Sequence, residues 1–487
     1  MEPTRPDSAP WRDVLVLTLL AALYRFFFVW AMPRAIDSPD AIGYLRFAQS
    51  MAGLEGGVAN TNLPLLYPLL CAPLMALGVE AEWAGRIVAL IAGLMLIPAV
   101  YFVALPLFGR TAARIACVAV ALWPWLADYA WRISPDGLAL TLWFASFALL
   151  IRAMRVGGPW AIAAGLCFFA LHLARPEGSF LFLGSIVPAA LLAPDRAALV
   201  RRFAPLAGVT LAGIALQALV MRIVAGSTAV NTRVTNPARS IEYVLVERGT
   251  EAAQALFTLA FETLPLMVGP YLFLFAGVAL LLPSKMRDGR AELALLAFAA
   301  GHVALAGMST YAEPRYILAP VVAVSLWGAR GIVMSASAML VGDARRWAVL
   351  PIAGLLAWQA LTTALTVLPE HLGRLPRMPH EYRIAGEWLR DNAEPGVIIT
   401  RRTQIAFYAG MTATGPGETE PLPDLIARAQ RLGARYLVVD ERHGVAASPA
   451  LRPLLDPANA PPSLRLLTAD VSPYANGRVV IYEILPP

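Results

Sequence analysis

The sequence predicts a polytopic α-helical membrane protein with a small α/β domain at its C-terminal end. Of 487 residues, 58% are hydrophobic and 15% are charged, whereas a soluble domain typically carries about 25% charged residues. The mean hydropathy is +0.61. Long apolar runs continue to about residue 367, and the residues after it have an ordinary globular composition. We therefore expect a membrane domain over residues 1–367 and a soluble domain over residues 368–487.

The basic balance of the chain belongs to the membrane region. The formal net charge is +6, yet residues 369–487 hold 13 Arg and 13 acidic residues. An excess of Arg beside apolar runs is typical of connections on the cytoplasmic side of a membrane. The charge thus indicates membrane topology, with lipid as the partner of this region, and gives no reason to expect a nucleic-acid partner.

Eleven apolar runs are candidates to cross the bilayer. About 18 residues are needed, because the hydrocarbon core is about 30 Å thick and a helix rises about 1.5 Å per residue. The first run has no small-residue cleavage site after it, so we expect an uncleaved anchor. The runs lie near residues 13–33, 84–107, 113–130, 137–151, 160–174, 179–193, 203–224, 263–283, 291–309, 316–335 and 347–367.

A further apolar segment, residues 64–78, is expected to lie in the membrane interface. It is short and contains Pro64, Pro68 and Pro73, which interrupt helical hydrogen bonding. If it does not span, the basic connections all fall on the N-terminal side, in agreement with the positive-inside bias. We therefore expect a multi-pass protein of the cell membrane, that is, the inner or plasma membrane. Eleven spans place its N-terminus in the cytoplasm and residues 368–487 on the extracytoplasmic side.

The long connections and the tail carry local patterns of their own. Residues 42–54 have helical apolar spacing, which favours an amphipathic helix lying along the bilayer surface. The connection over about residues 225–262 is polar and long, so it is a candidate lid. A docking or acceptor-binding role is the modest expectation for the tail. Its expected helices are 381–392 and 425–431, and its expected strands are 397–400, 435–440 and 478–485.

Acidic residues and arginines gather at turns on one expected face of the membrane. Ionisable groups at the ends of spans are the first functional candidates in a membrane protein. Two acids follow the first span, one opens the fourth span, and two later turns each pair an acid with an arginine. These residues are Asp37, Asp40, Asp136, Arg175, Glu177, Glu313 and Arg315.

Short motifs around these residues resemble the GT-C superfamily of polyprenyl-phosphate-sugar-dependent glycosyltransferases. Asp40 precedes Tyr44 by four residues in the first long connection. The motifs that follow are NLPLLYPLL at 62–70, WAGR at 83–86, LFGRTAAR at 107–114, SPD at 134–136, ARPEG at 174–178 and EPRY at 313–316. In this order they are similar to protein O-mannosyltransferases and to the aminoarabinose transferases of lipid A. The resemblance covers residues 13–335.

The resemblance implies a GT-C-like fold and an inverting hexosyl- or pentosyltransferase of cell-envelope glycan biosynthesis. Its donor would be a polyprenyl-phosphate sugar, and its acceptor a hydroxyl group of a glycan, a lipid or a protein. Asp40 matches the implied base, and Asp136 matches the second acid. One departure is at Asn62-Leu63-Pro64-Leu65, where many relatives of the aminoarabinose type carry a basic residue that contacts the lipid phosphate. Arginine elsewhere would have to supply that charge.

The expected chemistry agrees with these residue types. An attacking hydroxyl needs a carboxylate within hydrogen-bond reach to take its proton, and a phosphate leaving group needs positive charge, which arginine offers bidentately. A divalent cation held by the acids is left open. The catalytic candidates are Asp40, Asp136 and Asp37, and the substrate-binding candidates are Arg175, Arg315, Arg132, Glu313, Tyr44 and Tyr316.

Simpler roles stay open for the same residues. Asp37 or Asp40 would suit the start of a helix at Ser38-Pro39-Asp40, and Asp136 would suit a cap after Pro135. The acid–arginine pairs in the two later turns would suit structural ion pairs. Two other functions are a flippase for a polyisoprenoid lipid and a non-catalytic scaffold that displays the tail. The odd span number and the lack of repeated halves argue against transport.

Overall fold

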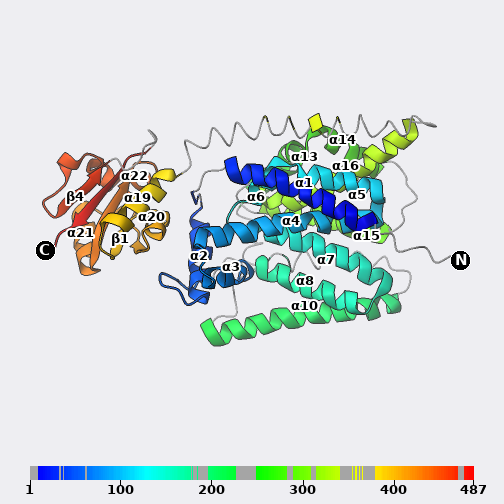
Figure 1. The fold of residues 1–487 in the computed structure, drawn as a ribbon, viewed down its shortest axis with the longest axis horizontal. Helices are drawn as coiled ribbons and strands as arrows, with labels where there is room; N and C mark the ends of the chain where they lie inside the picture. The colour runs from blue at the N-terminus through cyan, green and yellow to red at the C-terminus, as the bar shows by residue number, and fades with distance from the viewer. Residues whose placement is uncertain are drawn as a thin grey trace. The chain divides into compact units, whose positions relative to one another are not determined.

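A computed structural model describes most of the chain, and contacts divide it into two compact units. The helical unit contains Met1–Ala31, Thr61–Leu70 and Gly85–Leu368, and the mixed unit contains Met32–Asn60, Cys71–Ala84 and Pro369–Pro487. Figure 1 shows the elements of both units. The residues described are 9–31, 35–36, 38–60, 63–176, 178, 184, 196–225, 248–281, 289–308, 314–339, 354, 357–358, 361, 365, 379–469 and 477–486.

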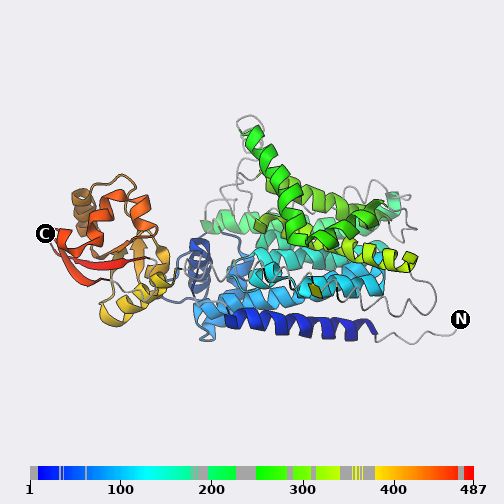
Figure 2. The same ribbon diagram turned by 90° about the horizontal axis from the view of Figure 1, so that it is seen from above.

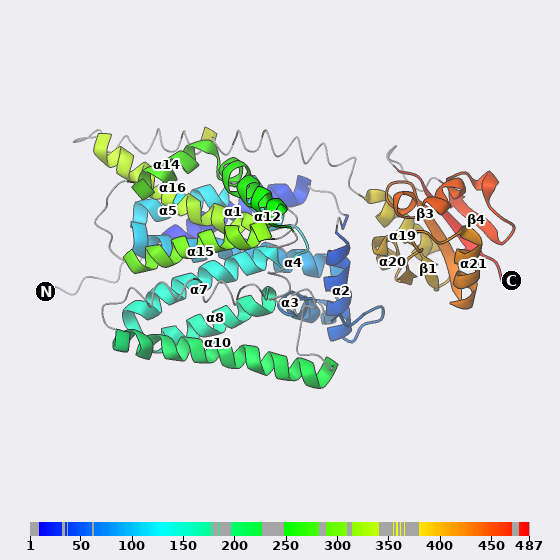
Figure 3. The same cartoon turned by 180° about the vertical axis from the view of Figure 1, so that it is seen from behind.

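The helical unit consists of packed apolar helices. Helix α1 runs along one edge of the unit (Figure 2), and α7, α8 and α10 lie side by side (Figure 3). On the other side, α16 packs against α5, α14 and α15. The helices are α1 (Ala9–Ala31), α3 (Leu66–Ala76), α4 (Ala81–Phe108), α5 (Arg110–Ala121), α6 (Pro124–Tyr129), α7 (Asp136–Val156), α8 (Pro159–Ala174), α10 (Arg196–Ala225), α12 (Gly249–Phe257), η3 (Thr258–Thr263), α13 (Leu264–Val268), α14 (Pro270–Leu281), α15 (Gly289–Met308), η4 (Pro314–Ile317) and α16 (Leu318–Met339).

Four helices in the described residues are long and apolar enough to cross a membrane: Ala81–Phe108, Asp136–Val156, Phe203–Ile223 and Arg315–Ala338. A fifth candidate joins Gly249–Val268 to Pro270–Leu281 with a bend of 111°. Gly269, with φ +86°, lies at this bend, in a region of backbone space that favours glycine. The class of polytopic helical membrane protein with a small sheet domain is therefore confirmed, and the number of eleven spans stays a prediction.

The expected span over residues 113–130 is wrong as a single helix. Helix α5 ends at Ala121, and α6 begins at Pro124. Proline has no N–H to continue the hydrogen-bonding of a helix and is well suited to the first position of a new one. The expected spans 179–193 and 347–367 lie almost wholly outside the described residues, as does most of the expected lid at 225–262.

The topology derived from charge is tested by a fusion experiment. A reporter enzyme that is active only outside the cytoplasm, fused after residue 370, is expected to be active. The reason is that 11-residue α3, with Pro73 inside it, is about half the length that a membrane span needs. A matched fusion in the basic connection after Arg346 is expected to be inactive. The opposite pair of results would reverse the orientation and with it the assignment of segment 64–78.

The mixed unit combines helix α2 (Pro39–Met51) with a five-stranded sheet of order β2-β1-β3-β5-β4. Strand β1 pairs parallel with β2 and β3, and β5 pairs antiparallel with β3 and β4. The helices and strands expected in the tail are all confirmed. The elements are α19 (His380–Asn392), β1 (Val397–Ile399), α20 (Thr403–Tyr408), β2 (Thr412–Thr414), α21 (Leu422–Arg431), β3 (Ala434–Asp440), α22 (Gly444–Ala447), η6 (Pro449–Leu455), η7 (Pro457–Asn459), β4 (Leu464–Ala469) and β5 (Val479–Ile484).

Alternating side chains of β3, the central strand of the sheet, contribute to two hydrophobic cores, one on each face. Leu437 and Val439 point to the core that contains Leu425 of α21. Tyr436 and Val438 belong to the core that contains Ile405 of α20 and residues of α19. This period of two is what a strand covered on both faces requires. The mixed unit therefore contains helices on both faces of its sheet, together with parts of the connection between α1 and α4.

The amphipathic helix expected after the first span is confirmed as α2. Ser38 caps it, because its Oγ accepts the N–H of Asp40 at 3.2 Å. Ile42, Leu45 and Ala48, which recur at helical spacing, are buried on one face. The carboxylate of Asp40 is therefore not the cap of this helix.

Candidate functional site

A hairpin of two helices brings the first pair of candidate residues together. Helices α7 and α8 pack against each other, and the short link between them contains Gly157 and Gly158 with φ +72° and +59°. The start of α7 and the end of α8 must therefore lie at the same end of the hairpin. Asp136, the first residue of α7, forms an ion pair there with Arg175, which follows α8.

The Asp136–Arg175 pair is largely removed from solvent. The side chain of Asp136 is 5% exposed and that of Arg175 is 22% exposed. A buried carboxylate is costly unless a cation and hydrogen-bond donors compensate it, and a helix N-terminus also favours negative charge. The structure thus gives Arg175 a partner in α7, whereas Glu177, the partner suggested by the sequence, lies outside the described residues.

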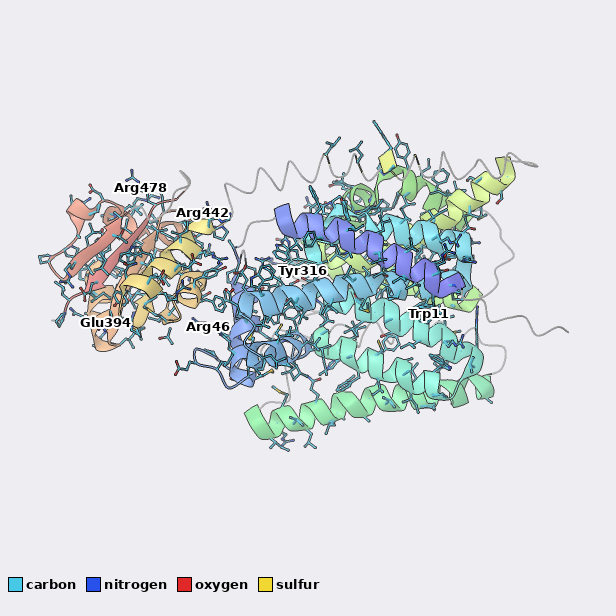
Figure 4. The ribbon with its side chains drawn as sticks, in the orientation of Figure 1. Trp11, Arg46, Tyr316, Glu394, Arg442 and Arg478 are labelled. Atoms are coloured by element: carbon cyan, nitrogen blue, oxygen red, sulfur yellow. The ribbon has the colours of Figure 1, made fainter. Side chains whose placement is uncertain are left out.

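A second arginine approaches the same place from η4. The guanidinium carbons of Arg175 and Arg315 lie 5.8 Å and 5.1 Å from the ring centroid of Tyr316. Arg315 Nη2 also donates a hydrogen bond to the Tyr316 hydroxyl at 3.2 Å. Figure 4 places Tyr316 and Trp11 toward opposite ends of the helical unit, so the two cations gather around one ring near one end.

The turn between α6 and α7 adds a third arginine. Arg132 Nε forms an ion pair with Asp128 Oδ2 at 2.7 Å, and its guanidinium carbon lies 5.2 Å from the ring centroid of Tyr129. The backbone oxygen of Tyr129 lies next to Gly137, the second residue of α7. The turn that carries Arg132 therefore lies beside the start of α7, where Asp136 pairs with Arg175, and Arg175 and Arg315 both contact Tyr316.

Two further polar residues lie near these side chains: Asp128, which the sequence analysis did not name, and Arg86, which it named only as part of the WAGR motif. Asp128 is 3% exposed, and Arg86 of α4 lies over the ring of Trp131 at 4.0 Å. A usable signal existed for Asp128, because it is an acid within the aromatic run WPWLADYAWR, and an acid within an apolar segment is a functional candidate by default.

The first-connection candidates belong to the mixed unit. Asp40 lies in the first turn of α2 and is exposed, whereas Tyr44, one turn further along, is 8% exposed. Residues four apart share one helix face, so the two lie on the same side of α2. Asp37 and Glu313 lie outside the described residues.

Within the part of the chain that the structure describes, no group of three or more His, Cys, Asp or Glu side chains is suited to hold a metal ion. Asp37, one of the acids considered for a cation, lies outside that part of the chain.

Comparisons with known proteins show similarity to membrane glycosyltransferases. The family model of dolichyl-phosphate-mannose-protein mannosyltransferases matches residues 62–221. No curated protein matches the chain. Among solved structures, ArnT from Cupriavidus metallidurans in the apo state is similar with a TM-score of 0.64 and 15% identity, over 98% of both chains. ArnT bound to undecaprenyl phosphate gives 0.62 and 16%, over 96% of this chain and 97% of that one.

Two further structures share the arrangement of helices over part of their own length. The oligosaccharyltransferase AglB from Archaeoglobus fulgidus, in complex with an inhibitory peptide and a dolichol-phosphate, has a TM-score of 0.55 and 14% identity, over 89% of this chain and 69% of that chain. The mycobacterial arabinofuranosyltransferase AftD has a TM-score of 0.56 and 18% identity, over 98% of this chain and 42% of that chain.

These findings define a class by fold: a polytopic helical membrane protein that has the fold of the solved glycosyltransferases ArnT, AglB and AftD. The chain is similar to members of the GT-C superfamily, and residues 62–221 match a mannosyltransferase family model. This similarity agrees with the resemblance noted in the sequence.

Proposed function

We propose that the protein is a GT-C glycosyltransferase that moves a sugar from a polyprenyl-phosphate donor to an acceptor hydroxyl on the extracytoplasmic face. The observation that carries this proposal is the placement of Arg175 and Arg315 around Tyr316, beside the buried acid Asp136. Guanidinium groups gathered at the end of apolar helices suit a lipid phosphate, because arginine binds phosphate through two parallel hydrogen bonds. Similar folds bound to undecaprenyl phosphate and dolichol-phosphate support this ligand class.

The proposed reaction is one displacement at the anomeric carbon. The acceptor oxygen attacks that carbon, the bond to the donor phosphate oxygen breaks, and its electron pair stays on the phosphate. Asp40 takes the proton of the attacking hydroxyl. Arg175 and Arg315 stabilise the negative charge on the departing lipid phosphate, and Asp136 holds Arg175 in place through their ion pair. A single displacement inverts the anomeric configuration and forms no covalent sugar–enzyme intermediate.

Binding of undecaprenyl phosphate tests the donor site. Arg175→Lys and Arg315→Lys are each expected to raise the Kd of this lipid by about tenfold, because lysine keeps the charge and loses the planar pair of donors. Hydrogen bonds to charged groups contribute about 1.5–3 kcal/mol, which is a factor of about ten or more in Kd. Native mass spectrometry of the purified full-length protein with added undecaprenyl phosphate measures the change.

Arg330→Lys is the matched control. Arg330 of α16 pairs with Glu292, in the first turn of α15, so it is a buried arginine in an ion pair outside the proposed site. The control is expected to keep the wild-type Kd. Wild-type affinity in both Arg175→Lys and Arg315→Lys would remove the phosphate from this site and reopen the interpretation as a scaffold.

A further inference from the structure

The hydroxyl group of Tyr408 joins both ends of the first connection, the segment between α1 and α4. Tyr408 is the last residue of α20. Its hydroxyl oxygen accepts the backbone N–H of Ile36 at 3.0 Å and donates to Glu82 Oε2 at 3.1 Å. Ile36 lies shortly after α1, and Glu82 lies in the first turn of α4. All three residues belong to the mixed unit.

This junction is buried and satisfied by further partners. Ile36, Glu82 and Tyr408 are 2%, 4% and 7% exposed. Arg383 Nη1 donates to the same Glu82 oxygen at 3.4 Å, while its Nε donates to Glu387 Oε1 at 2.9 Å. A buried carboxylate is stable only when cations and donors compensate it. Loss of one donor to Glu82 therefore removes a hydrogen bond and also leaves a buried carboxylate oxygen without the partner that offsets its desolvation.

Tyr408 keeps its proton throughout the physiological range. Burial raises the pKa of its phenol well above the ordinary value, and the adjacent Glu82 carboxylate raises it further. The phenol is therefore neutral, with one O–H to donate and lone pairs to accept. A neutral hydroxyl can serve the Ile36 N–H and the Glu82 carboxylate together, which neither a phenylalanine nor a phenolate can do.

A second contact holds the helix that carries Asp40. Helix α2 packs against α20, and Arg46 Nη2 donates to the backbone oxygen of Met411 at 2.8 Å. Arg46, labelled in Figure 4, extends from α2 toward the segment after α20. The start of α2 is thus fixed at Ile36 and its middle at Arg46. Asp40 lies between these two points, four residues beyond Ile36.

We propose that Tyr408 is a positioning residue, which acts with Glu82 and Arg383 to hold the start of α2, and hence Asp40, in the geometry required for transfer. The inference rests on the proposed role of Asp40 as base. It assigns the C-terminal α/β domain a part in catalysis: through α20, the domain orders the connection on which the base is carried. Misplacement of a catalytic group by about 1 Å is enough to cost about a hundredfold in rate.

The test combines an activity-independent measurement with kinetics on Tyr408→Phe in the full-length protein. Hydrogen–deuterium exchange of the backbone from Ile36 to Met51 is expected to become about tenfold faster, because the Ile36 N–H and Glu82 each lose a partner. Turnover of a polyprenyl-phosphate sugar is expected to fall about tenfold or more, while the Kd of undecaprenyl phosphate stays at the wild-type value. A purely structural role would not separate turnover from donor affinity in this way.

Tyr482→Phe is the matched control, because Tyr482 is also buried and its hydroxyl donates to the Leu454 backbone oxygen at 2.6 Å within the C-terminal domain. It is expected to lower thermal stability and to leave both exchange near α2 and turnover unchanged. Wild-type exchange and turnover in Tyr408→Phe, with Asp40→Asn inactive, would overturn this inference alone. Full activity of Asp40→Asn would instead overturn the role of Asp40 as base in the proposed function, whatever the exchange data show.

Discussion

Asp40→Asn is expected to lower turnover by a factor of about 10²–10⁴ while leaving the Kd of undecaprenyl phosphate nearly unchanged. General-base assistance typically contributes this factor, which corresponds to about 3–5 kcal/mol of barrier. Asparagine keeps the shape of the side chain and removes its capacity to accept a proton. Structural damage should be slight, because Ser38, not the Asp40 carboxylate, caps α2. Release of undecaprenyl phosphate from a panel of undecaprenyl-phosphate sugars by the purified protein measures turnover.

Asp37→Asn is the comparison that decides between the two neighbouring acids. It is expected to cost less, since Asp40 keeps the four-residue spacing to Tyr44. If both variants are equally inactive and added Mg²⁺ or Mn²⁺ changes the wild-type rate, the two acids share a cation. Normal turnover in Asp40→Asn together with its loss in Asp37→Asn would assign the base to Asp37.

Asp136→Ala is expected to destabilise the protein by about 3–5 kcal/mol and to weaken binding of undecaprenyl phosphate. Removing one partner of a buried ion pair leaves the other charge uncompensated, and here the remaining charge is Arg175 at the end of α8. The expected loss of affinity follows because Arg175 loses the ion pair with Asp136 that helps to orient its guanidinium group. Thermal unfolding in detergent gives the change in stability, and native mass spectrometry gives the change in Kd.

The double variant Asp136→Ala/Arg175→Met separates structure from binding. It is expected to recover much of the stability, because an apolar pair can replace a buried ion pair at little cost, and to remain weak in lipid-phosphate binding. Glu292→Ala, which breaks the buried pair with Arg330, is expected to lower stability and to keep the wild-type Kd. Full recovery of lipid binding in the double variant would show that the pair serves stability alone.

Local patterns in the sequence were sufficient to predict the class of protein and many of its helices and strands. Long apolar runs indicate membrane helices because the bilayer imposes a length on them. Apolar spacing predicted α2, and short β-rich and helical runs predicted the helices and strands of the tail. The same reasoning was wrong for the single span at 113–130, since Pro124 begins a new helix. The mean hydropathy of a long sequence window is almost unchanged by a single proline, so it does not indicate that the helix ends there.

Side-chain partners were decided by the tertiary structure. The sequence suggested Glu177, a neighbour in the chain, as the partner of Arg175. The packing of α7 on α8 brings Asp136, which is distant in the chain, into an ion pair with the same arginine. The gathering of Arg175 and Arg315 at Tyr316 likewise depends on segments distant in the chain. An ion pair of this kind leaves no periodic trace in the sequence, because it depends on where two helices end and not on their composition.

The connection between α1 and α4 shows most clearly what the sequence determined and what only the tertiary structure decided. The sequence by itself determined that it contains an amphipathic helix with an acid near its start, because helical spacing is a local property. Only the tertiary structure decided that Ile36 and Glu82 meet at the hydroxyl of Tyr408. Burial at this junction requires each polar group to have a partner, and the partner is supplied by a residue more than 300 positions away in the chain.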